Sequence, residues 1–283
     1  MRQEDVLSAR IQRKTIVITG ASSGIGAAAA QQLAARGARL CLVARREDEL
    51  RQVQAAIEAR GGQCWVYPAD LTEEKSLDAC AAAILAEHPR VDVLVNNAGR
   101  SIRRLVSESF DRFHDYQRTM QINYFAPVRL TQKLLPQMLA RNSGHLINVS
   151  SYSTLVPVPR FAAYVASKMA LEGFSQSLAA EMVGKNIHVT LIHYPLVKTP
   201  MTAPTAAYKY IKQMDVDEAA GWIVTAIEKR PARMATRIGE AWGVAQKALP
   251  LLTTALTGRL LMNRAKKLAT LVAQEQKAQS SGS

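Results

Sequence analysis

Short apolar runs alternate along the chain with segments in which apolar residues recur at helical spacing. The apolar runs have the composition of strands that are buried on both faces of a parallel sheet. Helices are predicted over Ile25 to Arg36, Glu47 to Arg60, Glu73 to Glu87 and Asp217 to Lys229, and an edge strand over Arg233 to Ile238. The main predicted strands are Thr15 to Thr19, Arg39 to Val43, Gln63 to Tyr67, Val91 to Val95, His145 to Ser150 and Ile187 to His193. This alternation of strand and helix predicts an α/β fold with a doubly wound parallel sheet of the Rossmann type.

The pattern predicts a single domain with an extension at each end. A chain of 283 residues, 48% of them hydrophobic, can bury one large core. The predicted Rossmann domain covers residues 14–240, with an N-terminal extension at 1–13 and a basic, partly amphipathic C-terminal helical extension at 241–283. No internal repeat or interdomain linker is visible, and only residues 280–283 have a composition typical of disorder.

Cysteine spacing and the N-terminal composition argue against several classes of protein. Cys41, Cys64 and Cys80 have neither metal-site nor redox-pair spacing, so we expect small buried hydrophobes in a reducing compartment and no metal. The first residues are charged and lack the apolar segment of a signal peptide. The uncharged run from Thr15 to Ala35 contains three glycines, which favours a turn over a membrane span. A cytoplasmic protein is the resulting expectation.

A glycine-rich turn follows the first predicted strand directly. Gly20 would allow the tight turn, Gly24 the approach of backbone to a pyrophosphate, and Gly26 close packing of the following helix on the sheet. Free N–H groups at the helix N-terminus would favour the phosphates. A glycine cluster alone is often only a loop, but its position between strand and helix predicts a dinucleotide site. The predicted contacts are Gly20, Ser22, Ser23, Gly24, Ile25 and Gly26.

Two arginines at the end of the second strand bear on the choice of cofactor. NAD-binding sites place an acidic side chain there, whereas NADP requires a cation. Arg45 occupies the position where the 2′-phosphate would lie, and its planar guanidinium can donate two hydrogen bonds to a phosphate. The alternative is that Arg45 and Arg46 only open a solvated helix. We predict NADP(H).

Tyr164 and Lys168 are four residues apart, with Ser151 upstream. On a helix, residues at this spacing lie on one face, so the lysine ammonium can lie beside the phenol. Its charge would pull the tyrosine pKa of about 10 toward the range of a working acid or base. Alone, the spacing also fits an amphipathic helix surface.

Together, these motifs resemble the classical short-chain dehydrogenase/reductase family over roughly residues 14 to 240. The resemblance implies a catalytic set of Asn123, Ser151, Tyr164 and Lys168, with Asn123 holding a water in a proton relay. It also implies further cofactor contacts, which are Asp70, Leu71, Asn97, Ala98, Gly99, Tyr164, Lys168, Pro195, Val197 and Thr199. Asp70 could instead cap the next helix, and Asn123 could satisfy backbone groups.

One motif departs from the family pattern. The family often has Pro-Gly after its sixth strand, where this chain has Tyr194 and Pro195. A stiff residue would then replace a permissive one beside the nicotinamide, so we expect a different contour on the substrate side.

A narrower resemblance concerns the substrate. It is to the reductase domain of bacterial fatty acyl-CoA reductases that make aldehydes, and it weakens after about residue 245. The stretches that carry it are Asn96 to Arg104, Asp111 to Asp115, Arg160 to Lys168, Pro195 to Thr205 and Arg230 to Gly239. The implied reaction is NADPH-dependent reduction of a long-chain acyl-CoA thioester. Reduction of a ketone or aldehyde, oxidation of a secondary alcohol, and a non-catalytic NADP-sensing role remain alternatives.

Positive charge bears on the partners. The formal net charge is +13, and residues 229–283 hold ten Lys or Arg against two Glu, a difference of +8. Such charge could attract coenzyme A phosphates, an acidic carrier protein or an anionic membrane, or could be only a solvated face. Arg103 and Arg104 are the better phosphate candidates because they follow the cofactor-lining turn. No nucleic-acid motif is present, so no nucleic acid is expected.

The C-terminal extension combines leucines with Arg and Lys. Its uncharged run from Ala248 to Gly258 is eleven residues, too short to span a bilayer. It is expected to lie on the inner face of the membrane, on its own domain or on a second subunit, since members of the resembling family commonly form homo-oligomers. Pro250 and Gly258 are expected to interrupt any continuous helix.

Overall fold

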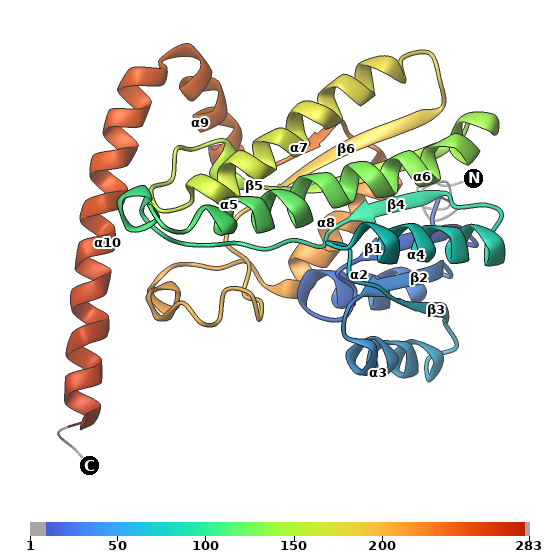
Figure 1. The fold of residues 1–283 in the computed structure, drawn as a ribbon, viewed down its shortest axis with the longest axis horizontal. Coiled ribbons are helices and arrows are strands. Elements are labelled where there is room, and N and C mark those ends of the chain that lie inside the picture. Colours follow the sequence, from blue (N-terminus) through green and yellow to red (C-terminus); the bar gives the residue numbers. More distant parts are fainter. Residues whose placement is uncertain (1–9, 281–283) are drawn as a thin grey trace.

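The computed structural model describes residues 10–280 as a seven-stranded parallel sheet between two layers of helices, with a C-terminal helical pair at one side (Figure 1). The strand order is β3-β2-β1-β4-β5-β6-β7. The strands are β1 (Thr15–Thr19), β2 (Arg39–Ala44), β3 (Gln63–Pro68), β4 (Val93–Asn96), β5 (Gly144–Ser151), β6 (Ile187–Tyr194) and β7 (Arg233–Met234). The predicted doubly wound sheet is confirmed.

One face of the sheet is covered by α2 (Gly24–Ala34), α3 (Glu47–Glu58) and α8 (Val216–Lys229). The other is covered by α4 (Glu74–Glu87), α6 (Ala126–Ala140) and α7 (Ala162–Glu181). The strands are apolar on both sides because each face packs on helices. The central strand β1 is buried at every position.

Strands β2 and β3 are added on one side of β1, and the later strands β4 to β7 are added on its other side. The strand order therefore reverses between the neighbours β1 and β4. In open α/β sheets, ligands bind beyond the carboxyl ends of the strands at such a reversal. The segments that follow β1, β4, β5 and β6 therefore meet at one edge of the sheet, and they contain most of the predicted site residues.

One long helical segment on this edge changes its pitch. It runs from α5 (Phe113–Met120) through a π-helical turn, η2 (Gln121–Phe125), into α6. Short 3-10 turns mark three loops, η1 (Val106–Glu108), η3 (Tyr152–Thr154) and η4 (Ala206–Tyr210). Single π-turns inside helices are frequent at functional sites.

The chain after β7 differs from the prediction. The expected edge strand ends at Met234, because the Thr236 hydroxyl accepts a hydrogen bond from the Gly239 N–H at 3.1 Å and caps α9 (Arg237–Ala248). The expected interruption of the C-terminal helix is confirmed at Pro250, because α9 ends at Ala248 and a new helix begins at Pro250, but it was wrong at Gly258. Helix α10 (Pro250–Ser280) is continuous, because Pro250 occupies its first position, where proline is tolerated, and Gly258 is accommodated inside it.

Helix α10 contacts α9 and η4, and its C-terminal half projects beyond the rest of the molecule (Figure 1). Within the described residues, no helix has the length and apolar character needed to cross a membrane. Most of the predicted N-terminal extension and most of the predicted disordered tail lie outside the described residues.

Candidate active site

The glycine turn between β1 and α2 has the close contacts that its sequence predicts. Gly20 and Gly24 have positive φ, +67° and +55°, a region that favours glycine. A Cβ on Gly26 would lie 2.3 Å from the carbonyl oxygen of Gly20, so only glycine allows α2 to start this close to the strand. Ser22, Ser23 and the N-terminal N–H groups of α2 lie in the turn itself. The turn thus forms a cradle of backbone that suits a phosphate group.

Thr19 ties this turn to the end of β4, a role that the sequence did not reveal. Its hydroxyl accepts hydrogen bonds from the N–H groups of Asn97 and Ala98, both at 3.0 Å. The Asn97 amide in turn donates to the Thr19 carbonyl at 2.9 Å. A Cβ on Gly20 would be 2.9 Å from Cα of Ala98. The predicted contacts Asn97 and Ala98 are therefore packed directly against the glycine turn.

Arg45 and Asp70 lie together just beyond the ends of neighbouring strands, with Nη1 of Arg45 3.6 Å from Oδ2 of Asp70. Asp70 does not cap α4, whose N-cap is Glu73. It instead accepts hydrogen bonds from the N–H and hydroxyl of Thr72 at 2.8 and 2.7 Å. Burial opposes ionisation of Asp70, but the Thr72 bonds and the Arg45 charge outweigh it and lower its pKa. Leu71 is buried beside them.

Arg46 reaches the glycine turn. Its guanidinium donates to the hydroxyls of Ser22 and Ser23 at 3.3 and 3.1 Å and pairs with Glu49 at 2.6 Å. The sequence drew attention to Arg45 alone, although the adjacent arginine was visible. Both guanidinium groups are largely exposed and lie on the side where an adenosine phosphate would be bound.

The segment after β6 closes over the same turn. Thr199 lies 3.4 Å from the position that a Cβ would take on Gly24, and Val197 is buried in a bridge to Met214. Pro195 is partly buried between them and the strand. These three predicted contacts therefore lie on the cofactor side of the sheet edge.

Tyr194 itself does not line the site, so the expected change in the substrate-side contour remains a prediction that concerns Pro195. Its ring is buried against Trp222 of α8, with centroids 5.6 Å apart, and its hydroxyl donates to the Ala219 carbonyl at 2.6 Å. As the last residue of β6, Tyr194 points to the same face as Ile192, away from the site. Burial raises its pKa well above the ordinary range.

Ser151 and Tyr164 form a hydrogen-bonded pair between the end of β5 and the start of α7. Ser153 donates to the Ser151 oxygen from both its hydroxyl, at 2.9 Å, and its N–H, at 3.2 Å. These bonds use the acceptor capacity of Ser151, so its own hydrogen is left to face Tyr164 or a substrate. Ser153 is a further positioning residue that the sequence motifs did not indicate.

The pKa of Tyr164 is raised, contrary to the sequence prediction. Burial is the main cause, and it outweighs the hydrogen bond from Ser151, which lowers the pKa; nearby Tyr208 raises it further. The prediction considered the charge of Lys168 but not the loss of water around the phenol. In this structure Tyr164 is therefore a protonated phenol near neutral pH, which is the form that can donate a proton.

Lys168 lies behind Tyr164 and is buried. Its Nζ donates to the Val149 carbonyl at 2.7 Å and lies 3.4 Å from the position of a Cβ on Gly99. The Asn123 Oδ1 lies 3.0 Å from the same Cβ position, so a side chain at residue 99 would come between the Lys168 ammonium and the Asn123 amide. Burial lowers the pKa of Lys168 to about 8, partly offset by Glu172.

Asn123 occupies the π-turn, and its amide is held from two sides. Its Oδ1 accepts from the Arg100 N–H at 2.8 Å, and its Nδ2 donates to the Arg100 carbonyl at 2.8 Å and to Ser167 at 2.9 Å. Ser167 also donates to the Tyr164 carbonyl at 2.7 Å. The alternative role of satisfying backbone groups is thus present in this structure. A relay water remains a prediction.

Glu172 lies on α7, one helical turn after Lys168. It accepts a hydrogen bond from Ser150 and lies 3.3 Å from Nδ1 of His193. His193 also contacts the Thr154 hydroxyl at 3.2 Å. Burial lowers the pKa of His193, so the ring is neutral near pH 7. This network was not evident from the sequence because β5, α7 and β6 supply its members.

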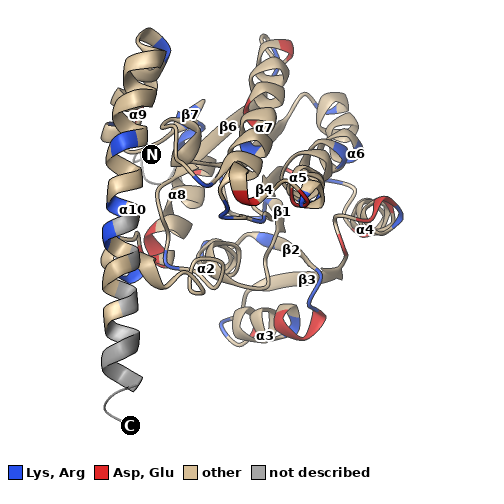
Figure 2. Ribbon diagram, turned by 60° about the vertical axis from the view of Figure 1, so that its left-hand side comes forward, with Lys and Arg blue, Asp and Glu red and all other residues tan. Residues whose placement is uncertain are grey.

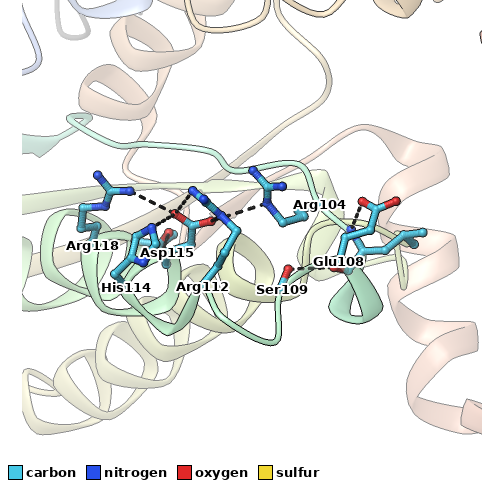
Figure 3. A network of polar contacts seen from close by, with 9 residues as sticks. Arg104, Glu108, Ser109, Arg112, His114, Asp115 and Arg118 are labelled. Atoms are coloured by element: carbon cyan, nitrogen blue, oxygen red, sulfur yellow. Dashed lines mark hydrogen bonds and ion pairs between the residues drawn. The ribbon is translucent and has the colours of Figure 1, made fainter.

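A cluster of arginines lies beyond Gly99, around the buried carboxylate of Asp115 (Figure 3). Arg112 and Arg118 donate to it at 2.9 and 3.1 Å, and Arg104 lies 3.6 Å away. Hydrogen bonding from Arg112 is the main reason that the pKa of Asp115 is lowered. Residues 100–118 contain five arginines and three carboxylates, so positive charge remains in excess. Arg104, a predicted phosphate candidate, thus belongs to a larger basic cluster.

The residues at this edge fit a nicotinamide dinucleotide. The glycine turn supplies a cradle that Cβ atoms would fill, Arg45 and Arg46 supply cations, and Lys168 and Tyr164 lie at the opposite end beside Gly99. The three cysteines are buried free thiols with raised pKa values. Across residues 10–280 there is no group of His, Cys, Asp or Glu that could hold a metal ion.

This fold, with Ser151, Tyr164 and Lys168 gathered at one edge of the sheet, is the arrangement expected of a dinucleotide-binding oxidoreductase. Residues 14–209 match the model of the short chain dehydrogenase family. The chain belongs to this family, which confirms the resemblance seen in its motifs.

Three proteins within this family illustrate what the chain is similar to. The chain is 50% identical over 247 residues to a fatty acyl-CoA reductase of Acinetobacter baylyi, and the matched region covers 87% of this chain and 84% of that protein. It is 43% identical over 247 residues to a fatty acyl-CoA reductase of Mycobacterium tuberculosis, with the same coverage of 87% and 84%. A solved metagenomic short-chain oxidoreductase in complex with NADP is 31% identical, with a TM-score of 0.69, and covers 80% of this chain and 98% of that one.

Proposed function

We propose that this protein is an NADPH-dependent reductase that converts a long-chain fatty acyl-CoA thioester to an aldehyde. The observation that carries the proposal is the grouping of Tyr164 with Ser151 at the start of α7, one helical turn from the buried Lys168. A proton donor in this position serves reduction of a carbonyl group. The thioester substrate rests on the similarity to fatty acyl-CoA reductases.

The cofactor would be held from the glycine turn to Lys168. Gly20, Gly24 and Gly26 would receive the pyrophosphate, and Thr199 would close over it. Arg45 and Arg46 would meet the 2′-phosphate, which is why we propose NADP(H) rather than NAD(H). When bound, NADPH supplies the hydride that reduces the carbonyl carbon.

Ser151 and Tyr164 would hydrogen-bond the carbonyl oxygen as it gains negative charge. Tyr164 donates its proton to that oxygen, giving a thiohemiacetal. The C–S bond then breaks, the hydroxyl proton returns to Tyr164, and the departing thiolate takes a proton from water and leaves as coenzyme A. One hydride and one proton are consumed overall, and Lys168 stabilises the transient phenolate through its charge.

The basic cluster around Asp115 would face the polar part of the substrate. Coenzyme A carries several phosphate charges, and the guanidinium groups of Arg104, Arg112 and Arg118 are held in place by one buried carboxylate. Planar guanidinium groups suit phosphate oxygens. A ketone or aldehyde substrate would use the same Ser151 and Tyr164 but would have no need of this cluster.

The test follows NADPH oxidation and free thiol together, using purified protein and palmitoyl-CoA. Equal amounts of oxidised cofactor and released thiol are expected. Oxidation without thiol would exclude the thioester reaction and favour a ketone or aldehyde. If acyl-CoAs, aldehydes and ketones all leave the absorbance of NADPH unchanged while the protein binds it, the protein is a non-catalytic NADP-sensing protein.

The variant Tyr164→Phe tests the assigned acid. It removes only the phenolic oxygen, so we expect turnover to fall by at least about a thousandfold, while the Kd for NADPH changes by less than about threefold. Retained turnover would refute the role of Tyr164. Tyr152→Phe, also at this edge of the sheet, is the matched control and should keep activity.

A further inference from the structure

Helix α10 presents leucines to solvent and threonines to the protein. Leu252, Leu256 and Leu260 recur every four residues on one side, and their exposed fractions are 63%, 47% and 57%. We refer to these three residues as the leucine row. Thr253 and Thr257, on the side that faces the protein, are only 5% and 4% exposed. A surface helix normally has the opposite arrangement, with its apolar stripe toward the core.

A hydrogen bond between α9 and α10 supports this orientation of the helix. The Thr253 hydroxyl donates to Oε1 of Gln246 on α9 at 2.6 Å, whereas the Thr257 hydroxyl donates within α10, to the Thr253 carbonyl at 2.6 Å. Turning the helix to bury the leucine row would break the contact with α9 and expose both threonines. The row is therefore held outward by the packing of α9 against α10.

More apolar side chains surround the row. Leu251 is 87% exposed, and α9 together with its C-cap adds further large side chains that are exposed to solvent. These neighbours are Ile238, Val244 and Leu249. Contiguous exposed apolar surface of this kind marks an interaction site on a folded protein.

The charge between the start of α9 and the end of α10 is mostly positive. Residues 241–274 contain five Lys or Arg and no Asp or Glu. Arg259 and Lys267 lie on the side of the leucine row by helical spacing, and Arg264 lies close to it; all three are exposed. Figure 2 shows that basic residues recur along α10, which lies at the edge of the molecule. A row of leucines bordered by cations matches an anionic membrane surface.

We propose that α10 docks on an anionic lipid membrane, with the leucine row in the acyl boundary and Arg259, Arg264 and Lys267 at the headgroups. The helix would lie in the plane of the interface. A second copy of the chain is a poorer occupant, because a symmetric contact would bring the same cations together, and residues 241–274 contain no carboxylate to pair them. Lipid phosphates supply the missing negative charge.

Docking at this position would bring the membrane close to the reaction site. Helix α10 contacts η4, and Tyr208 of η4 is near enough to Tyr164 to raise its pKa. An apolar chain leaving the membrane beside α10 would therefore meet the segment next to the catalytic tyrosine. This route applies to any hydrophobic carbonyl substrate, so the docking stands apart from the choice of acyl-CoA.

Sedimentation with vesicles tests the proposal on the full chain. Vesicles of phosphatidylglycerol and phosphatidylcholine in equal parts are compared with vesicles of phosphatidylcholine alone, at low and high salt. We expect binding to the anionic vesicles, weakened by salt, and at least tenfold less binding to the neutral ones. Because pelleting reads binding alone, its result is independent of whether the protein reduces acyl-CoA.

Two double variants assign the surface. L256Q/L260Q should weaken vesicle binding at least tenfold, and R259Q/R264Q by about 25-fold, because each basic residue near an anionic surface contributes about fivefold. The matched control L139Q/V183Q replaces two exposed apolar residues, one near the end of α6 and one just after α7, and should bind as the unaltered protein does. The C-terminal ends of α6 and α7 lie far from α10 (Figure 1). Since all these positions are exposed, circular dichroism should show unchanged folding.

Three results would overturn the proposal. They are the absence of binding to anionic vesicles, equal binding to neutral vesicles, and unaltered binding by L256Q/L260Q. A dimer in light scattering that L256Q/L260Q dissociates, together with no vesicle binding, would instead assign the leucine row to a second copy.

Discussion

Lys168 should make the cofactor-free protein less stable than a variant that lacks its charge. The side chain is buried, and its pKa falls from 10.5 to about 8. A difference of this size corresponds to about 3 kcal/mol of unfavourable burial of the charged form, because each tenfold change in proton affinity is worth about 1.4 kcal/mol. Replacement by methionine, which has a similar volume and no charge, removes this cost.

The substitution Lys168→Met also removes the hydrogen bond to the Val149 carbonyl, a loss of about 1 kcal/mol. The net gain in free energy of unfolding at pH 7 is then about 2 kcal/mol. For a chain of 283 residues, this corresponds to an increase in Tm of about 3 °C. Turnover should be lost at the same time, so the variant would separate stability from activity.

The pH dependence has a defined sign. Below pH 8, both the folded and the unfolded state of the unaltered protein carry the lysine proton, and the full cost is present. Between about pH 8 and 10.5, the unfolded state binds more protons than the folded state, so the stability contributed by this group rises with pH. The advantage of Lys168→Met should therefore be constant below pH 8 and disappear toward pH 10.5.

Scanning calorimetry of the cofactor-free protein measures both effects. Lys185→Met is the control, because Lys185 is exposed and its substitution should change the free energy of unfolding by less than about 0.5 kcal/mol. A Tm for Lys168→Met several degrees below that of the unaltered protein at pH 7 would refute the assigned cost of burying the charge.

Three further substitutions test the surroundings of the site. Glu172→Gln removes a charge that raises the pKa of Lys168, so the fall of kcat/KM on the alkaline side should move to lower pH; an unchanged pH profile would contradict the coupling. Arg46→Ala should raise the Kd for NADPH roughly tenfold in a fluorescence titration, and an equal loss of NADH affinity would show that the arginine does not recognise the 2′-phosphate. Gly26→Ala should cost at least about 2 kcal/mol of unfolding free energy and most of the NADPH affinity, because its Cβ would overlap the preceding turn. Gly173→Ala, on α7 with open space around it, is the matched control and should be neutral or stabilising by up to about 1 kcal/mol in the same denaturation experiment; a similar loss in both variants would contradict the steric explanation.

The parts of the fold that are set by local pattern could be predicted from the sequence. Strands buried on both faces appear as apolar runs, and β1 (Thr15–Thr19) has the predicted ends. The glycine turn was also predictable, because its backbone requires residues without a Cβ at Gly20 and Gly26. These features depend on near neighbours in the chain.

Other features depend on contacts between distant segments. The pKa of Tyr164 rises because several elements exclude water from it, whereas the Tyr-Lys spacing indicated only the nearby charge. Glu172 becomes important only when β5 and β6 bring Ser150 and His193 to it. The direction of Tyr194, in contrast, could have been inferred, since strand alternation places it on the same face as Ile192.

The π-turn at Gln121–Phe125 determines how far α6 is rotated about the helix axis relative to α5. One additional residue in a helix rotates everything that follows by about 100°. Helix α6 can therefore turn its apolar side to the sheet while α5, before the turn, packs on α7 and directs Asp115 toward the arginines of the neighbouring loop. The extra residue of the π-turn thus sets the angle between α6, which supports the sheet, and α5, which would meet the substrate. Asn123 lies in the turn where this rotation occurs.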